Sequence, residues 1–558
     1  MTTAFVRQLG AEPGVQLNPL QDSSEIPSQD NADQIFGIIM RATRGRIDKP
    51  FVVDSSNVYT KLGYGEPIRV SALNEAWVHV VEALSNGAYQ AVVQRLSTSE
   101  SKIKWAVVKK PAPLEEGEPD SDAATFEFSV SADDTAPEDC FIAVKHLECF
   151  NDGIKIKLHA DQNRVSGENQ ATSEVTLQII DPHNDESIYE FKGSLLPDAR
   201  DDYGNSCYLP DVVSSQTDAV EVIVGATGGE AVIEPTDDCY GYDSNGTVAW
   251  SESDTLVCFT EGKTEYEVEN YVEACEKLQY TQFDFAYLSS GGSQAKGLIQ
   301  QLAQLAYDTN KQLRFDVPGT LSVEAAISWV EDLNLGANKC AHLLHAFWSP
   351  LKSDDPTGVN PKSVIGTATL NIALACGRNA VKNAKGFAAK NYPIAGREWQ
   401  VNRTGIVQIC TPKKSESDAL AKAKINPVVY ETYSGGGRYV FLDSLTCAKV
   451  DQSQRKLIAV ADMSTDIDDK VTRAGKDYLQ LPINEAVKRM SDYLDALLSG
   501  AQASGWLDAS NDPAMGGAAY KFEVAPNELK PYDAMDVRYW VRYVGTARQI
   551  FVTQTLTR

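Results

Sequence analysis

The spacing of hydrophobic and polar positions divides the chain into segments with strand and helix patterns. Over residues 34–97, two short apolar runs at Ile35–Met40 and Phe51–Val53 precede a 3.6-residue apolar period and a third apolar run. Over residues 269–395, strand and helix patterns alternate again, which favours parallel strands connected by helices. We therefore expect a multidomain α/β protein, in which 34–97 and 269–395 form a core of helices on a mainly parallel sheet.

Two further segments have different patterns. Residues 98–268 show short alternating strands separated by Gly, Asp, Asn and Pro, which predicts a mostly β domain inserted into the core. Residues 396–536 combine short strands with a long amphipathic helix around 483–498, which predicts an α+β domain. One face of that helix is apolar. The other face carries Lys488, Arg489, Asp492 and Asp495.

The two ends of the chain are predicted to be extended arms. Residues 1–33 contain three prolines and a polar stretch, which break any helix, and residues 537–558 alternate as a strand with no cap or turn after it. Exposed strand edges invite pairing, so the apolar residues of both arms are candidate subunit contacts. The alternative is that both ends fold back onto their own domain. The candidates are Phe5, Val6, Leu9, Val15, Leu17, Tyr539, Val541, Tyr543, Ile550 and Val552.

Charge and composition narrow the classes of partner. The chain has 558 residues, with 51 Lys and Arg against 77 Asp and Glu, so its net charge is −26. Such a protein is repelled by phosphate backbones, which argues against nucleic acid as a partner. Acidic residues crowd between Lys110 and Lys145, where a solvated outward loop is expected. The start of the chain lacks a signal-peptide core and no apolar run reaches 18 residues, so we expect folding in a cytoplasm and no membrane insertion.

One turn suggests catalysis. Residues 291–295, Gly-Gly-Ser-Gln-Ala, lie between a predicted strand and helix and differ by one residue from the nucleophile elbow of α/β hydrolases. That chemistry needs a later histidine in a loop, but only His342 and His345 follow, both within an apolar strand pattern. Ser293 is more simply explained as a cap of the next helix. The alternative function is therefore an α/β hydrolase or small-molecule binding protein centred on this turn.

Metal and cofactor motifs are also weak. Cys340 and His342 would share one face of a predicted strand and His345 the other, so the three could not converge on a metal. The ten cysteines are scattered without a C-x-x-C pair, which argues against a zinc framework and leaves disulfides open. We expect no catalytic, cofactor-binding or metal site, and no enzyme.

Several short motifs together resemble the contractile tail sheath family of phages and related injection machines. Residues 36–53 resemble its strand, arginine–glycine turn and strand, with Arg46 where the family often has proline, and residues 86–96 resemble the strand that closes this unit. Residues 346–350 resemble its aromatic–proline strand end, and residues 503–507 approximate its motif after the long helix. The resemblance covers 1–97 and 269–558. The acidic middle matches the position of variable, outward-facing insertions.

The resemblance implies a structural role without an active site. Sheath subunits form a helical sleeve of six-membered rings around an inner tail tube, and their arms add strands to neighbouring subunits. Contraction by rigid-body rearrangement drives the tube through the host envelope to deliver the genome. The implied partners are further copies, the tube protein, the baseplate and the tail terminator. The helix carrying Lys488 and Arg489 would face the tube, and the protein would belong to the virion tail after assembly in the host cytoplasm.

Overall fold

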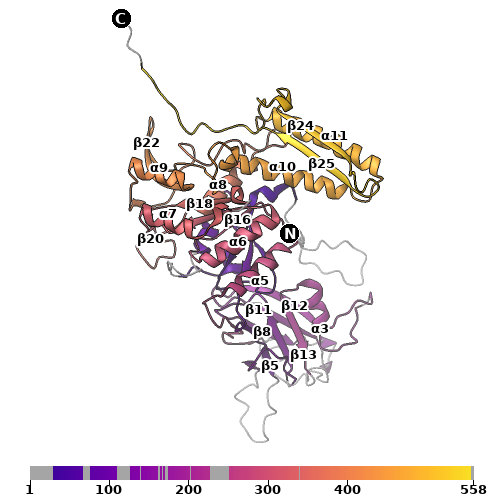
Figure 1. Ribbon diagram of the computed structural model, residues 1–558. Coiled ribbons are helices and arrows are strands. Elements are labelled where there is room, and N and C mark those ends of the chain that lie inside the picture. The colour runs from indigo at the N-terminus through magenta and orange to yellow at the C-terminus, as the bar shows by residue number, and fades with distance from the viewer. Residues whose placement is uncertain are drawn as a thin grey trace, which may run out of the picture.

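The computed structural model describes residues 29–66, 76–109, 126–138, 140–160, 164–165, 168–169, 174–201, 203–225, 250–337 and 340–554. Its centre is an eight-stranded sheet in the order β2-β3-β1-β16-β17-β18-β22-β23 (Figure 1). The six strands from β3 to β22 run parallel, and the antiparallel strands β2 and β23 form the edges. The strands span Ile35–Met40 (β1), Phe51–Val53 (β2), Gln90–Arg95 (β3), Tyr287–Ser289 (β16), Gln312–Val317 (β17), Leu344–Trp348 (β18), Ile425–Tyr433 (β22) and Gly436–Phe441 (β23).

Helices cover both faces of this sheet. Successive residues of a strand point to opposite faces, and apolar residues on both faces need to be covered. In β1, Ile35 and Ile39 pack with α5, α6, α7 and α9, whereas Phe36, Ile38 and Met40 pack with α2 and α8. The mixed α/β architecture confirms the coarse prediction. The helices span Val58–Leu62 (α1), Ala76–Ser85 (α2), Val268–Gln279 (α5), Lys296–Thr309 (α6), Val323–Asp332 (α7), Ala368–Ala380 (α8) and Lys414–Lys422 (α9).

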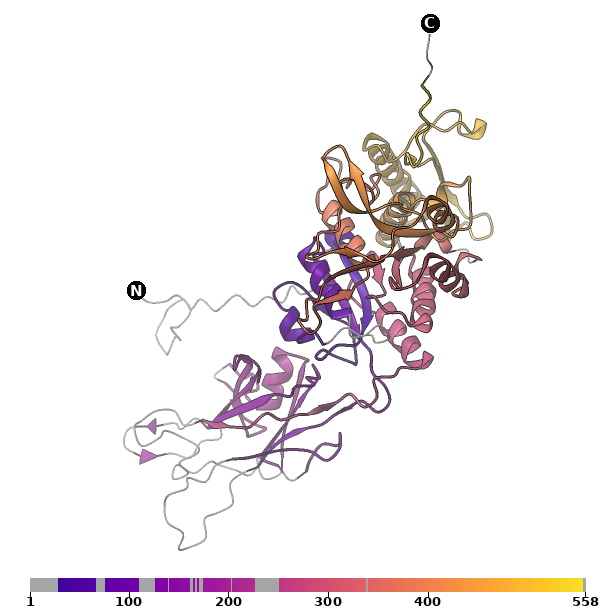
Figure 2. The same ribbon diagram turned by 90° about the vertical axis from the view of Figure 1, so that its left-hand side faces the viewer.

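The described residues between β3 and α5, called the insertion, form a lower lobe built mainly of antiparallel strands (Figure 2). Two four-stranded sheets, β12-β11-β8-β14 and β13-β7-β5-β6, enclose an apolar core of their own. Strands β4 and β15 pair where the chain enters and leaves the lobe. The elements span Lys102–Ile103 (β4), Ala106–Lys109 (β5), Glu127–Val130 (β6), Ile142–His146 (β7), Lys155–Ala160 (β8), Arg164–Val165 (β9), Glu168–Asn169 (β10), Glu174–Ile180 (β11), Ser187–Ser194 (β12), Leu209–Gln216 (α3), Val220–Val224 (β13), Ser251–Glu252 (β14) and Phe259–Thr260 (β15).

The C-terminal layer consists of two long helices, α10 (Ile458–Asp477) and α11 (Ile483–Ala503), and a hairpin. The C-terminal hairpin pairs β24 (Tyr520–Pro526) with β25 (Met535–Val541) and lies on α11 (Figure 1). Its inward side chains join those of the two helices in a third apolar core. A small sheet of β19 (Leu351–Asp354), β20 (Lys362–Val364) and β21 (Val407–Gln408) borders the core.

Neither a membrane span nor a metal cluster is found among the described residues. No helix in the described ranges is both long and apolar enough to cross a bilayer. No group of three or more His, Cys, Asp or Glu side chains in those ranges is placed to hold a metal ion. The nine cysteines of the described residues are free, and Cys239 lies outside them.

Candidate assembly surfaces

The turn at residues 291–295 is a buried part of the core. Helix α6 begins at Lys296 with Ala295 as its N-cap, so Ser293 precedes the helix and is not the N-cap residue. The Ser293 side chain is only 2% exposed, and its Oγ accepts a hydrogen bond from the Ala295 N–H at 3.2 Å. The cavity beside this turn, lined by Gly292 and Asp316 among others, has a volume of about 20 Å³. That is room for about one water molecule.

The cysteine–histidine segment differs from the expected continuous strand. A short 3₁₀ helix, Ala341–Leu343, separates Cys340 from β18, so His342 lies outside the strand and His345 inside it. The physical reason is that Leu343 donates its N–H to the carbonyl of Cys340, which closes a helical turn before the strand begins. His345 is fully buried and pairs in register with Arg314 of β17.

Two buried histidines make the stability of the fold depend on pH. Burial lowers the pKa of His79 from 6.5 to about 4 and that of His345 to about 3. The unfolded chain therefore binds more protons than the folded protein below about pH 6.5, so stability falls as the pH falls. Asp316 has the opposite effect on the pH dependence of stability. Burial raises its pKa from 3.8 to about 6, so it adds stability as the pH falls through that value.

Replacing His345 by Gln should flatten this dependence. Between pH 7 and pH 5, wild-type stability should lose about 2 kcal/mol through His345 alone, since one pKa unit corresponds to about 1.4 kcal/mol. Urea unfolding at the two pH values measures the loss, with His183→Gln as the control because His183 is exposed. An equal loss in His345→Gln and wild type would contradict the assignment.

An arginine-rich turn between β1 and β2 joins the core to the insertion. Arg44 is fully buried, and its guanidinium pairs with both carboxylate oxygens of Asp181 at 2.6 and 2.7 Å and with Asp152. It also lies over the Phe150 ring, 4.0 Å from the centroid. Burial alone would lower the pKa of Arg44, but its hydrogen bonds to the two carboxylates raise it overall. The turn between β1 and β2 is therefore the joint of the two lobes.

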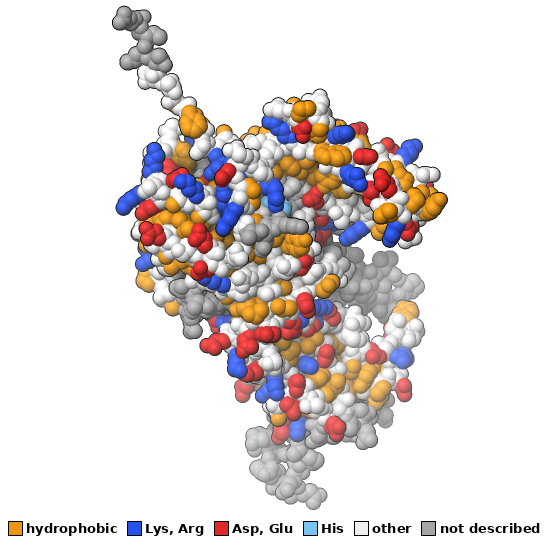
Figure 3. Space-filling view, in the orientation of Figure 1, with side chains coloured by type: hydrophobic (Ala, Val, Ile, Leu, Met, Phe, Trp, Pro, Cys, Tyr) orange, Lys and Arg blue, Asp and Glu red, His pale blue; other side chains and the backbone are white. Residues whose placement is uncertain are grey.

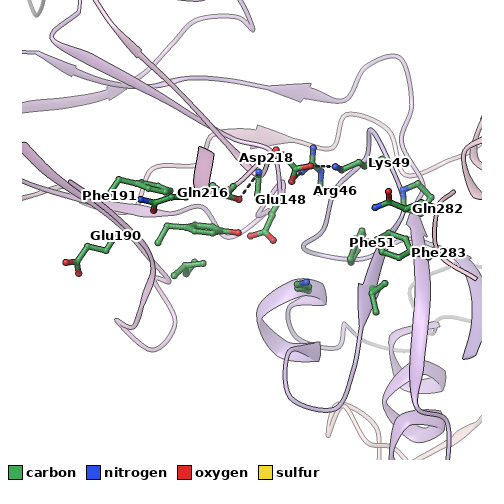
Figure 4. A pocket seen from close by; sticks show the side chains of 17 residues that line it. Arg46, Lys49, Phe51, Glu148, Glu190, Phe191, Gln216, Asp218, Gln282 and Phe283 are labelled. Atoms are coloured by element: carbon green, nitrogen blue, oxygen red, sulfur yellow. Dashed lines mark hydrogen bonds and ion pairs between the residues drawn. The ribbon is translucent and has the colours of Figure 1, made fainter. Parts of the chain in front are cut away.

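A cavity of about 660 Å³ lies beside this joint (Figure 4). Arg46 and Lys49 project into it from the core turn, and both form ion pairs with Asp218 of the insertion. Phe51 and Phe283 line its core side, as Figure 4 shows. Arg46 and Lys49 are thus already paired with the insertion, and the cleft belongs to the attachment of the two lobes.

Buried ion pairs attach the C-terminal layer to the sheet. Asp462 of α10 is 1% exposed and pairs with Arg314 of β17 at 3.1 Å and with Arg378 of α8 at 2.8 Å. Lys390 is 3% exposed and bridges Asp466 of α10 at 2.6 Å and Asp33 at 3.3 Å. Sequence reasoning missed all of these residues. The available signal was the occurrence of single charges within otherwise apolar patterns.

The root of the predicted N-terminal arm belongs to the core. Residues Gln29–Gln34 form a 3₁₀ helix against α8, where the Asn379 side chain donates to the carbonyl of Asp33 at 2.8 Å. This corrects the arm boundary at residue 33, because the Asp33 contacts with α8 and Lys390 hold this stretch in place. The candidate contacts Phe5, Val6, Leu9, Val15 and Leu17 lie outside the described residues.

The first half of the predicted C-terminal arm also folds within its own domain. Tyr539 and Val541 pair in register with Phe522 and Tyr520 of β24. Tyr543 is buried and forms an antiparallel β-bridge with Leu507. This corrects the expectation of an open strand from residue 537, because the preceding strand β24 and the apolar face of α11 already cover residues 535–544. The extended segment begins at residue 545.

The C-terminal arm, residues 545–554 as described, leaves the domain as an extended chain (Figure 1, upper left). Its last backbone attachment is the Val544 N–H, which donates to the carbonyl of Trp506 at 2.9 Å. Beyond it, Ile550, Phe551 and Val552 are 83%, 89% and 88% exposed. Three consecutive apolar side chains exposed to this degree exceed the scattered exposure of an ordinary surface, and their role as subunit contacts stays a prediction.

The C-terminal hairpin offers unpaired strand edges. Within the described residues, β24 and β25 form a sheet of two strands with no third strand beside either of them. Side chains such as Phe522 and Tyr539 cover α11 on one face, whereas Lys521 and Trp540 lie on the other. An edge of this kind is a template for a strand from another chain.

Helix α11 presents the four predicted tube contacts on one exposed face. Lys488, Arg489, Asp492 and Asp495 are all exposed, and the opposite face, which includes Leu494, is buried. Arg489 pairs with Glu485 one turn earlier at 2.5 Å, and Asp495 accepts a hydrogen bond from the Tyr520 hydroxyl at 3.3 Å. The structure thus places the four side chains together. Their contact with a tube stays a prediction.

Comparison with known proteins gave structural matches only. No protein-family model and no curated protein matches the chain. A sheath tail protein from Desulfitobacterium hafniense is 12% identical with a TM-score of 0.45, over 96% of this chain and 100% of that one. The contracted helical sheath of the anti-feeding prophage is 10% identical, with a TM-score of 0.44, over 98% and 99%. The contracted sheath of the extracellular contractile injection system PVC is 16% identical, with a TM-score of 0.40, over 55% and 76%. Each of these three structures is described as a sheath.

Proposed function

We propose that this chain is the subunit of a contractile tail sheath that polymerises helically around an inner tail tube. The observation that carries the proposal is that one subunit has both an exposed apolar arm, Ile550 to Val552, and a two-stranded hairpin whose edges have no neighbouring strand among the described residues. Strand addition would satisfy both, because main-chain hydrogen bonds supply affinity and alternate side chains set the register. The same features in a lone monomer are an aggregation hazard.

The distribution of charge supports an outward orientation of the insertion. Residues 98–268 hold 36 acidic and 11 basic side chains, whereas the rest of the chain holds 41 and 40. Acidic side chains also dominate the band between the two lobes on the face shown in Figure 3. Copies of the nearly neutral part can pack closely, while mutual repulsion of the insertions is least at the largest radius. The insertion therefore faces away from the tube.

Contraction in this proposal is a rigid-body rearrangement of subunits toward a lower-energy packing, with the arms as hinges. The energy is stored at assembly, and no nucleotide is hydrolysed in the sheath. The moving sheath drives the tube through the host envelope for genome delivery, with the baseplate and the tail terminator at its ends. The subunit assembles in the host cytoplasm and belongs to the tail of the virion.

Sedimentation velocity of the purified full-length chain over a range of concentrations tests self-assembly. The proposal expects a monomer at low concentration and very large species above a threshold, as for any nucleated helical polymer. A single monomeric boundary at every concentration would contradict it. Circular dichroism of the same samples measures whether the chain is folded. This separates failed assembly from failed folding.

Reversing the charge of Lys488 and Arg489 should impair assembly around the tube but leave folding intact. Both side chains are exposed on α11, and exposed ion pairs contribute about 0–1 kcal/mol each, so many of them hold a tube and release it together. We expect the double variant Lys488→Glu, Arg489→Glu to give fewer tube-filled tails in electron micrographs. The matched control reverses the charge of Lys413 and Lys414, which are exposed at the start of α9. Normal tube-filled tails from the α11 variant would reject this contact.

The alternative function, an α/β hydrolase or small-molecule binding protein centred on residues 291–295, is distinguished by covalent labelling. Ser293 is 2% exposed and accepts a hydrogen bond from the Ala295 N–H. A serine-directed fluorophosphonate is therefore expected not to label the chain. Stoichiometric labelling that disappears in Ser293→Ala would favour the alternative.

A further inference from the structure

We infer that the ion pair between Arg548 and Asp443 fixes the position from which the C-terminal arm leaves the subunit toward a second copy. The inference rests on the proposed function, because it concerns the arm that a sheath subunit would lend to its neighbour. It assigns a positioning role to two residues outside both the apolar contact and the hairpin.

The pair has the geometry of a strong, oriented contact. Arg548 Nε donates to Asp443 Oδ1 at 2.8 Å and Arg548 Nη2 to Oδ2 at 2.5 Å, a two-pronged arrangement that fixes direction as well as distance. The two side chains are 26% and 16% exposed. The hydrogen bonds that Arg548 donates to Asp443 raise the pKa of Arg548 above its usual value. Asp443 is itself oriented, because its Oδ1 also accepts the Ser444 N–H at 2.8 Å.

The pair connects two different parts of the subunit. Asp443 follows β23, the edge strand of the central sheet, whereas residue 544 is attached to the C-terminal layer through Trp506. The four residues from 545 to 548 reach at most about 14 Å, so the two attachments confine this short stretch of the arm. The second attachment lies on the core, and residues 549–554 beyond it are all exposed.

Loss of the pair would move the pivot of the arm back to residue 544. Ile550 to Val552 would then sample many positions around the hairpin end instead of one direction from the core. Ordering the arm on a second copy would cost more conformational entropy, and preorganised segments bind more tightly for this reason. The pair therefore governs how readily copies join, while each subunit folds as before.

Limited trypsin digestion of the full chain below its assembly threshold tests the pair directly. Trypsin cleaves after Arg548 only when the guanidinium is released, and the product is the peptide 549–558. We expect Asp443→Asn to release this peptide about tenfold faster than wild type, as for loss of a charge-assisted hydrogen-bonded pair. The matched control is Asp418→Asn, which removes the same charge from an exposed pair within α9. Equal release from Asp443→Asn and wild type would overturn the inference.

Assembly thresholds then test the positioning role. Arg548→Glu and Asp443→Arg are each expected to raise the concentration needed for assembly about tenfold, and the double reversal should restore it. Arg548→Lys keeps the charge but not the two-pronged geometry, so its threshold should lie between. Single reversals that assemble like wild type would overturn the positioning role and leave the sheath proposal standing. Wild-type chain that never assembles would instead reject the proposed function, whatever the digestion shows.

Discussion

Removal of residues 545–558 is expected to leave a folded monomer that no longer builds a sheath. The truncation removes no described residue of the central sheet, the insertion or the hairpin, and Val544 keeps its hydrogen bond to Trp506. It does remove the exposed apolar residues Ile550 to Val552. Thermal unfolding should therefore be close to that of wild type, while pelleting at high speed should be lost completely.

A variant of full length separates side-chain contact from chain length. Replacing Ile550, Phe551 and Val552 by Ser keeps the arm but removes its apolar side chains, so this variant should assemble poorly as well. Long sleeves from the C-terminally truncated chain would show that strand exchange through this arm is wrong.

Deletion of the predicted N-terminal arm should also prevent polymerisation. Removing residues 1–28 spares Asp33 and its contact with Lys390, whereas removing residues 1–33 does not.

Replacement of Asp462 by Ala should destabilise the fold by about 3–5 kcal/mol, because it leaves the buried charges of Arg314 and Arg378 without their shared carboxylate. Burial alone would raise the pKa of Asp462, but Arg378 and Arg314 hold it below its usual value. Both arginines are nearly inaccessible to solvent, so neither can recover the lost contact from water. Since the three residues come from α10, β17 and α8, the loss should loosen the C-terminal layer from the sheet.

Urea unfolding followed by tryptophan fluorescence measures this effect. The control is Asp469→Ala, also on α10, whose carboxylate is 39% exposed and pairs with Arg473. An exposed pair contributes less than about 1 kcal/mol, so the control should remain close to wild type. A similar small change in both variants would show that the buried cluster does not hold the layer in place.

The sequence predicts the central sheet well because its strands are short, apolar and bounded by turns. Ile35–Met40 and Gln312–Val317 are buried along their whole length, as expected for parallel strands covered on both faces. Residues 456–461, at the start of α10, have the pattern of a strand, although the helix begins at Ile458. Its apolar run continues through Ala461, and the helical period is hidden because the next inward-facing residue is Asp462, a charge buried against two arginines.

The assembly surfaces were less predictable, for a different reason. Alternation over 537–543 indicates a strand but carries no information on its partner, which is β24 of the same chain. Likewise, Arg44 and Asp181 are 137 positions apart, and no local pattern links them. The arrangement of four charges on α11 follows from helical periodicity alone. The Arg548–Asp443 pair joins residues 105 apart and became visible only in the folded chain.

Above all, this chain is expected to build a helical sleeve from its own copies. Negative-stain electron microscopy of the purified full-length chain at rising concentration tests it most directly, with the chain truncated after residue 544 as the control. Hollow, cross-striated tubes are expected from the full-length chain and dispersed particles from the truncated one. Dispersed particles from both chains at every concentration would contradict it.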